Sequence, residues 1–129
     1  MRDLQENTTT LVSVDSSGNA SGDGDSMAAS ISDDGQFIAF QSVATNLTSD
    51  DTNGTSDVFL RDLSNGTTIL VSVNVSGNVS GNDASMSAAI SADGGSVAFS
   101  SLATDLASVA LDTNGAFDVF IRDVQSGTT

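Results

Sequence analysis

The sequence predicts an all-β fold, and two observations support this prediction. The apolar residues fall into short runs rich in Val, Ile, Phe and Thr, and each run is bounded by Gly, Asn, Asp or Ser. Runs of this composition between turn-forming residues are typical of β-strands. The second observation is an internal repeat, because RDL at residues 2–4 returns at residues 61–63 and as RDV at residues 122–124.

The repeat defines the organisation of the chain. When residues 2–60 are aligned with residues 61–121, more than half of the positions are identical, and two extra residues fall near SVAL at 108–111. Self-similarity at a fixed period indicates a repeat architecture. We therefore expect one unit over residues 1–129, made of repeat 1 (2–60), repeat 2 (61–121) and a partial repeat (122–129).

Each repeat contains four predicted strands, named A, B, C and D in chain order. The expected ranges are 27–32 and 86–91 for strand A, 37–43 and 97–102 for B, 58–63 and 119–124 for C, and 67–73 for D, with its partner at 8–14. Asp34-Gly35 and Asp93-Gly94 separate A from B, and Asn65-Gly66 separates C from D. These dipeptides predict tight hairpins, because such turns need a positive φ.

Four antiparallel strands joined by hairpin turns describe a β-propeller blade. ISDDGQFIAFQS and ISADGGSVAFSS, followed by DVFLRD and DVFIRD, resemble the repeat of TolB-type, WD-repeat-like β-propellers. The resemblance covers nearly the whole chain in both repeats, although the period is about 60 residues rather than 40–45 and Trp is absent. It implies a propeller fold and an extracellular or periplasmic location. A β-solenoid is the alternative fold, but its rungs are shorter and lack paired hairpin signals.

Two blades cannot close a propeller ring on themselves. An isolated pair would expose two apolar faces and an unpaired strand edge, and such surfaces drive association. We therefore expect a homo-oligomer that closes by strand exchange, in which the N-terminal strand of one copy completes the last blade of its neighbour. A homotrimer with six blades is favoured, and a tetramer with eight blades is the alternative.

The charge and composition exclude several classes of function. The chain has 3 Arg, no Lys, 17 acidic residues and a net charge of −14, and it lacks His and Cys. It therefore has no Cys/His zinc site and no His or Cys catalytic group, and nucleic acid is an unfavourable partner. No apolar run is long enough to span a membrane, and residues 1–9 lack the apolar core of a signal peptide. Arg2, Arg61 and Arg122 share one repeat position, so we expect a structural role in which each pairs with a neighbouring carboxylate.

The longer connections are expected to share one face of the molecule. The B–C connections (44–56 and 103–117) and the D–A connections (15–26 and 74–85) are long, and Leu47 and Leu106 are expected to anchor the B–C loops on the core. Loops of this kind carry binding residues in many proteins. Ten acidic residues are assigned to this face or its edge: Asp15, Asp23, Asp25, Asp50, Asp51, Asp57, Asp83, Asp105, Asp112 and Asp118.

The clearest chemical candidate is DTNGTSD at residues 51–57, which is repeated as DTNGAFD at residues 112–118. Carboxylate and amide oxygens at positions 1, 3 and 7 around a Gly suit calcium, although the spacing differs from that of an EF-hand. The candidate ligands are Asp51, Asn53, Asp57, Asp112, Asn114 and Asp118. The alternative interpretation is that these residues cap backbone groups in an Asn-Gly turn.

Three functions are compatible with these features. The first is a non-catalytic propeller module that acts as an oligomeric scaffold or as a binding platform through its acidic long-loop face. The second is a calcium-dependent module that binds glycans or surfaces outside the cell. The third, a distant alternative, is a carboxylate-based hydrolase. We expect no enzyme, because that chemistry needs a close carboxylate pair in a cleft, and the sequence singles out no such pair.

Overall fold

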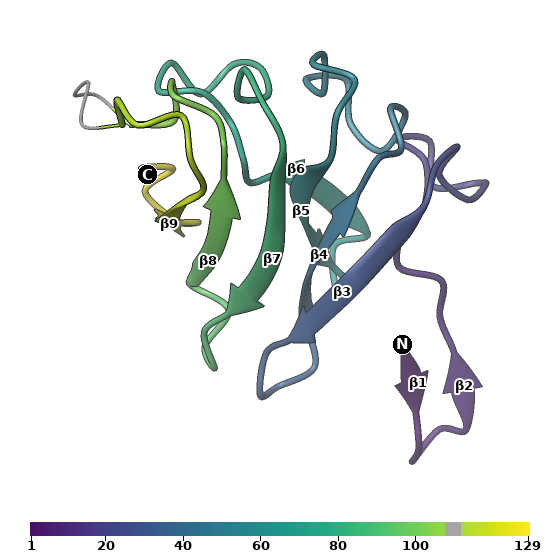
Figure 1. The fold of residues 1–129 in the computed structure, drawn as a ribbon. Coiled ribbons are helices and arrows are strands. Elements are labelled where there is room, and N and C mark those ends of the chain that lie inside the picture. The colour runs from purple at the N-terminus through teal and green to yellow at the C-terminus, as the bar shows by residue number, and fades with distance from the viewer. Residues whose placement is uncertain (108–111) are drawn as a thin grey trace.

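The computed structural model describes residues 1–107 and 112–129, and the regular structure in these residues is built of β-strands (Figure 1). The two extra residues of repeat 2, predicted near 108–111, lie outside the described residues. In chain order the strands are β1 (Arg2–Asp3), β2 (Thr8–Thr9), β3 (Ser26–Ile31), β4 (Phe37–Ser42), β5 (Asp57–Asp62), β6 (Thr67–Leu70), β7 (Ser85–Ile90), β8 (Ser96–Ser101) and β9 (Asp118–Asp123). Within the described part of the chain, no helix has the length and apolar character needed to cross a bilayer.

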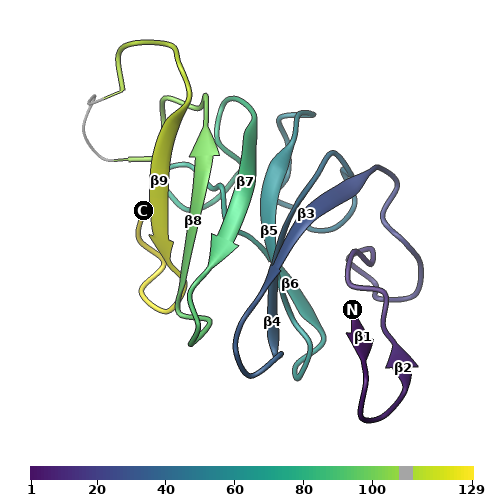
Figure 2. The same ribbon diagram turned by 60° about the horizontal axis from the view of Figure 1, so that its bottom comes forward.

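The strands form two blade-like sheets and a separate hairpin, which Figure 2 shows side by side. Blade 1 is the antiparallel sheet β3-β4-β5-β6, and blade 2 is the antiparallel sheet β7-β8-β9. The N-terminal strands β1 and β2 pair only with each other, with Arg2 opposite Thr9 and Asp3 opposite Thr8. The outer hairpin of blade 1 has the same register, with Arg61 opposite Thr68 and Asp62 opposite Thr67. The N-terminal hairpin is therefore a further copy of the outer hairpin of a blade.

Strands A, B and C lie within one residue of the predicted ranges, and their hairpin turns form as expected. Gly35 and Gly94 both have φ of 73° in the A–B turns. In the first of these turns, the Asp34 carboxylate accepts hydrogen bonds from the Ser32 hydroxyl (2.6 Å) and the Gln36 N–H (2.9 Å). The Asp therefore caps the turn, and the Gly supplies the left-handed conformation.

Strand D is shorter than predicted, since β6 ends at Leu70 and β2 at Thr9. The cause in blade 1 is a local irregularity after Leu70. The N–H groups of Val71 and Ser72 both point to the Val58 carbonyl (2.8 and 3.3 Å), and the Ser72 hydroxyl accepts the Val58 N–H (3.0 Å). A side chain thus replaces a backbone partner, which ends the regular ladder while the segment stays beside β5.

The innermost strand of each blade carries the same bulge. The register shifts between Met27 and Ser30 in β3 and between Met86 and Ala89 in β7. Ser87, within the second bulge, has a φ of 58° and donates its N–H to the Gln41 Oε1 of blade 1 at 2.8 Å. The bulge therefore directs a backbone donor of blade 2 across to the neighbouring blade.

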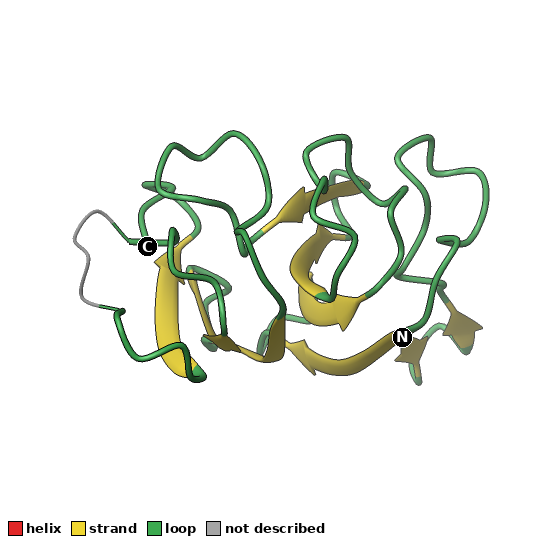
Figure 3. Ribbon diagram, turned by 45° about the horizontal axis from the view of Figure 1, so that its top comes forward, coloured by secondary structure: helices red, strands yellow, loops and turns green. Residues whose placement is uncertain are grey.

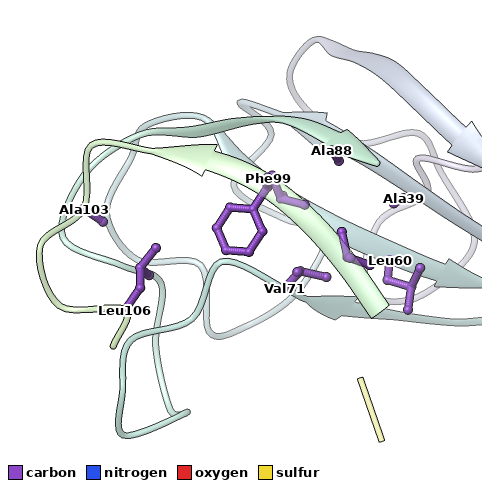
Figure 4. Packing of buried hydrophobic residues seen from close by; sticks show 9 residues of the cluster. Ala39, Leu60, Val71, Ala88, Phe99, Ala103 and Leu106 are labelled. Atoms are coloured by element: carbon purple, nitrogen blue, oxygen red, sulfur yellow. The ribbon is translucent and has the colours of Figure 1, made fainter. Parts of the chain in front are cut away.

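The main core lies between the two blades. Figure 4 shows this cluster, in which Ala39, Leu60 and Val71 of blade 1 meet Ala88 and Phe99 of blade 2. A second buried cluster lies on the opposite side of blade 1, and the N-terminal residue Val12 packs against it. The predicted anchors of the B–C loops are confirmed, because Leu47 and Leu106 are both buried in these clusters: Leu47 in the second and Leu106 in the first.

The long connections gather at one end of the sheets, at the top in Figures 1 and 3. Within repeat 1 the D–A and B–C loops bind each other. The Asp23 carboxylate accepts the Thr45 N–H (2.7 Å), and the Asp23 N–H donates to the Asn46 side chain (3.0 Å). In the next pair of loops, Asp105 accepts the N–H of Asn82 at 3.0 Å. Several acidic residues of this end therefore hold neighbouring loops together.

Candidate functional site

The two aspartates of the first DTNGTSD motif lie in the interior of the molecule. Asp57 is the first residue of β5, and its side chain is fully buried. Asp51 lies six residues earlier in the B–C loop and is 9% exposed. One oxygen of Asp57, Oδ1, accepts the hydroxyl hydrogen of Ser72 at 2.6 Å. Ser72, in the segment that follows β6, thus holds the Asp57 carboxylate in place through one of its two oxygens.

The remaining oxygens of this pair have no hydrogen-bond partner among the described residues. They are both carboxylate oxygens of Asp51 and the Oδ2 of Asp57, and all three are inaccessible to solvent. Buried carboxylate oxygens are normally hydrogen-bonded or bound to a cation, because an unpaired buried charge is costly. This pair is therefore the chemically unusual feature of the motif.

The surroundings raise the pKa of both acids. Burial raises the pKa of Asp57 to about 7, the Ser72 hydrogen bond opposes this shift, and the charge of Asp51 adds to it. Burial also raises the pKa of Asp51, with smaller contributions from the negative charges of Asp23 and Asp50. The contact with Asp57 lowers the pKa of Asp51, whereas the charge of Asp51 raises the pKa of Asp57. A buried pair of neighbouring acids of this kind shares a proton or holds a cation.

Asn53 and Asn114 act as the turn-capping interpretation describes. The Asn53 Oδ1 accepts the Thr55 N–H at 2.8 Å, and its Nδ2 donates to the Gly81 carbonyl at 2.8 Å. In the second motif, Asn114 Oδ1 accepts the Ala116 N–H at 2.7 Å. Each Asn therefore shapes its own turn, and Asn53 also ties the loop to the following D–A loop.

The second motif is built in the same way but is less enclosed. Both carboxylate oxygens of Asp112 are buried without a partner among the described residues. Asp118 is partly exposed, and its Oδ2 is 3.3 Å from the Asn114 Nδ2 donor. The repeat counterpart of Ser72 is Ser13, which belongs to the N-terminal segment before β3. Blade 2 consequently lacks the serine that Asp57 has in blade 1.

Two serines complete the first motif, and the sequence reading missed both of them. Ser72 binds Asp57, and the buried Ser80 accepts the N–H groups of Thr52 (3.0 Å) and Asn53 (3.1 Å) through its hydroxyl oxygen. The available signal was their recurrence at the same repeat positions, as Ser13 and Ser21. That signal was weak, because the chain contains many other repeated serines.

The arginines are structural, but their partners differ from the prediction. Each Arg donates from its Nη1 to a threonine hydroxyl on the adjacent strand or segment, rather than to a carboxylate. The pairs are Arg2–Thr9 (3.0 Å), Arg61–Thr68 (3.0 Å) and Arg122–Thr129 (2.9 Å). In the two hairpins the Arg and Thr are directly opposite in the antiparallel register, so the nearest acceptor is the cross-strand hydroxyl.

The two blades differ sharply in how their forward faces are covered. We define the forward face by Val58 and Leu60 in blade 1 and by their repeat counterparts Val119 and Ile121 in blade 2. In blade 1, where blade 2 covers this face, Val58 and Leu60 are 0% and 2% exposed. In blade 2, Val119 and Ile121 are 79% and 63% exposed. The same sequence positions are therefore core in one blade and surface in the other.

The opposite side of blade 1 is mostly covered and carries one hollow. We define this rear face by Ile38 and Phe40 in blade 1 and by their counterparts Val97 and Phe99 in blade 2. An apolar hollow of about 200 Å³ lies on it, lined by Met1, Val12, Ala29, Ser30, Ile31 and Ile38. Val12 packs against the rear face of blade 1, just as its counterpart Val71 lies in the cluster with Val97 and Phe99 of blade 2.

Comparisons with known proteins support the fold. No family model matches the chain, and no curated protein matches it. Among solved structures, TolB from Acinetobacter baumannii is similar, with a TM-score of 0.54 and 22% identity over 98% of this chain. The match covers 24% of the TolB chain, so this chain spans about a quarter of that protein. The sheet order, the hairpin turns and this likeness together show that the chain has a TolB-like β-propeller repeat fold.

Proposed function

We propose that this chain is a non-catalytic binding or scaffold module that associates with further copies of itself into a closed propeller ring. The TolB-like fold supports a module of this kind. The observation that carries the proposal is the exposure of Val119 and Ile121, whose counterparts in blade 1 are buried. Exposed apolar positions that are core elsewhere in the same molecule mark an interaction surface.

The junction between blades 1 and 2 is a template for the contact that a second copy would make. There the forward face of blade 1 packs against the rear face of blade 2, which is formed by Val97 and Phe99. Ile38 and Phe40 hold the same repeat positions on the rear face of blade 1. Ile38 and Phe40 are each only 3% exposed, so Val119 and Ile121 of a neighbouring copy would meet this face at the hollow lined by Met1, Val12 and Ile38.

Two polar contacts made by blade 1, one within the blade and one to the loop that leads to blade 2, have repeat counterparts too. Asp57 and Ser72 correspond to Asp118 and Ser13, and Asn53 and Gly81 correspond to Asn114 and Gly22. In blade 1 the first pair is hydrogen-bonded at 2.6 Å and the second at 2.8 Å. We expect the Ser13 hydroxyl of one copy to donate to Asp118 of its neighbour, with the N-terminal segment as strand D of that blade.

A ring of three copies has six blades and is favoured over four copies with eight blades. Its long-loop end is the proposed binding face, in an extracellular or periplasmic setting.

A hydrolase is a poor fit to the Asp51–Asp57 pair, because the fully buried side chain of Asp57 cannot contact a substrate. The pair therefore belongs to the structure of the module rather than to a catalytic cleft.

The test is the mass of the protein in solution, measured by light scattering coupled to size exclusion. We expect a trimer, with the tetramer as the other closed form. Val119→Asp should yield a folded monomer, because it places a charge at the centre of the proposed contact. Val75→Asp is the matched control, since Val75 is an exposed apolar residue of a D–A loop. A wild-type protein that is folded and monomeric at high micromolar concentration would overturn the proposal.

A further inference from the structure

We propose that Asp51 and Asp57 together bind a hard divalent cation, with calcium preferred over magnesium. This inference goes beyond the assembly of the module and does not depend on it, because both carboxylates belong to one chain. Asp57 is fully buried and Asp51 is 9% exposed, and their free oxygens are three: Oδ1 and Oδ2 of Asp51 and Oδ2 of Asp57.

The first argument is where the unpartnered buried atoms occur. Among the described residues, the side-chain oxygens or nitrogens that are buried without a hydrogen-bond partner number eight. Seven of them belong to the two copies of this B–C loop or to the first residue of β5: Thr48 Oγ1, both oxygens of Asp51, Thr55 Oγ1, Asp57 Oδ2 and both oxygens of Asp112. Native interiors contain few such atoms. Their concentration in one loop, and their recurrence at Asp112, indicate a ligand that both loops are built to hold.

The second argument is the charge around the pair. Besides Asp57, the negative charges that act on Asp51 are those of Asp23 and Asp50, so the local field is negative. The nearest arginine in sequence, Arg61, donates a hydrogen bond from its Nη1 to the Thr68 hydroxyl. Two buried carboxylates cannot both stay charged without a positive partner. A divalent cation satisfies both charges at once, and the surrounding negative potential raises its local concentration.

The third argument is the chemistry of the available ligands. Asp51 can bind through one or both oxygens, and Asp57 can bind through Oδ2 while its Oδ1 stays on Ser72. The set consists only of oxygen, which suits calcium and magnesium rather than zinc or copper. Calcium is preferred because it accepts irregular sets of six to eight oxygens, including water, whereas magnesium requires a regular octahedron.

The second motif gives the proposal an internal comparison. Asp112 has the same unpartnered oxygens as Asp51, but Asp118 is partly exposed and has no Ser72 counterpart beside it within its own blade. A less enclosed site holds a cation more weakly. We therefore expect one tight site per chain, at Asp51 and Asp57, and a second, weaker site at Asp112 and Asp118.

The experiment is a thermal melt and a calorimetric titration at about pH 8 after removal of metals with a chelator. Calcium at about one hundred times its Kd should raise the Tm of the wild type by roughly 10 °C. Asp51→Asn should abolish the tight site and this rise. Asp50→Asn is the matched control, because it removes the same charge from the neighbouring position without removing a proposed ligand, and it should keep most of the response. Magnesium at equal concentration should give a smaller rise than calcium in the wild type.

A second measurement keeps the test decisive. Without metal at about pH 8, Asp51→Asn should melt at a higher temperature than the wild type, because it removes the repulsion within the buried pair. This result would show that the variant is folded and that its lost calcium response is specific. If the wild type melts at the same temperature with chelator and with millimolar calcium, the pair shares a proton instead and the proposal is overturned. An equal loss in Asp50→Asn would also overturn it, since the effect would then be one of general charge.

Discussion

The side chain of Asp57 is enclosed between strand C and the segment after strand D, and this position alters its charge. Burial raises its pKa to about 7, and Asp51 adds to the shift. The folded protein therefore keeps a proton that the unfolded chain loses near its ordinary value of 3.8. The stability that this bound proton supplies is complete at pH values below the pKa of Asp57 in the unfolded chain, and it is lost as the pH rises to about 7.

This reasoning predicts how stability depends on pH in metal-free buffer. The free energy of unfolding should fall as the pH rises from about 4 to about 7, by at most about 1.4 kcal/mol per pH unit. Asp57→Asn should flatten this slope and stabilise the protein at about pH 8, because the amide still accepts from Ser72 and can donate to Asp51. Urea unfolding at several pH values measures the slope.

Asp62→Asn is the control for this prediction. Hydrogen bonds from Ser64 and Asn65 outweigh its desolvation and lower the pKa of Asp62 to about 2. Its own contribution to stability is therefore lost only at pH values below about 4, and the slope between about pH 4 and 7 should persist in this variant. A wild type whose stability is constant over that range would contradict the assignment of a raised pKa to Asp57.

The contacts of single side chains are the features that the sequence predicts least well. The pattern singled out Asp51 and Asp57 as candidate ligands, and it left calcium binding and turn capping open. The structure shows that Asn53 and Asn114 cap their turns, which the Asn-Gly pairs indicate locally. It also places Ser72 on Asp57, a contact between positions 15 residues apart that depends on strand pairing. The arginine partners were predicted wrongly for a similar reason, because the cross-strand register decides them.

Strands and turns follow more directly from the sequence than the site does. Strands A, B and C begin and end within one residue of the prediction because Gly turns bound them on one side. Strand D was predicted too long, since its alternating apolar residues continue to Val73. The pairing stops earlier because the Ser72 hydroxyl takes the place of a backbone acceptor for Val58.

The A–B turn of blade 2 allows a test of how tightly these elements pack. Gly94 has a φ of 73°, and a methyl group at this position would overlap the Phe37 ring of blade 1. Gly94→Ala should cost about 2–4 kcal/mol, from the left-handed backbone and the steric overlap together. Gly77→Ala, at a φ of 67° in open space, should cost only about 1 kcal/mol.

Urea unfolding at about pH 6 measures both variants. The difference between them isolates the contact between the hairpin of blade 2 and blade 1, since the backbone strain is shared. Equal losses of stability in Gly94→Ala and Gly77→Ala would mean that Phe37 moves aside freely. In that case the hairpin would not be part of the rigid junction between the blades.

At the level of the whole molecule, charge opposes the proposed assembly. Three copies would carry 3 × 14 = 42 net negative charges, and such repulsion is weakened by salt. The oligomeric fraction at fixed protein concentration should therefore increase between about 50 and 500 mM NaCl. Analytical ultracentrifugation measures this fraction, and Val119→Asp should stay monomeric at both salt concentrations. An unchanged distribution for the wild type would show that the charge has no role in association.

The blade architecture could be predicted because the pattern of each strand occurs in both repeats. The coverage of the faces was not predictable from one blade, since Val58 and Val119 have the same sequence environment but opposite exposure. Only the position of each blade within the chain distinguishes them. Burial in a repeat protein depends on which neighbour is present, and local sequence does not encode that information.

The register of the N-terminal hairpin has a consequence for the rim of such a ring. Arg2 and Asp3 face Thr9 and Thr8 as Arg61 and Asp62 face Thr68 and Thr67, and Asp123 likewise bridges Thr128. At each contact between copies in the proposed ring, the hairpin of β1 and β2 and the segment 122–129 of the neighbouring copy would thus be equivalent candidates for a single outer position. One of the two must remain displaced, so every copy would contribute one surplus segment to the outside of the ring. A peptide tag attached to this surplus segment would lie on the rim, once for each copy, without entering a blade.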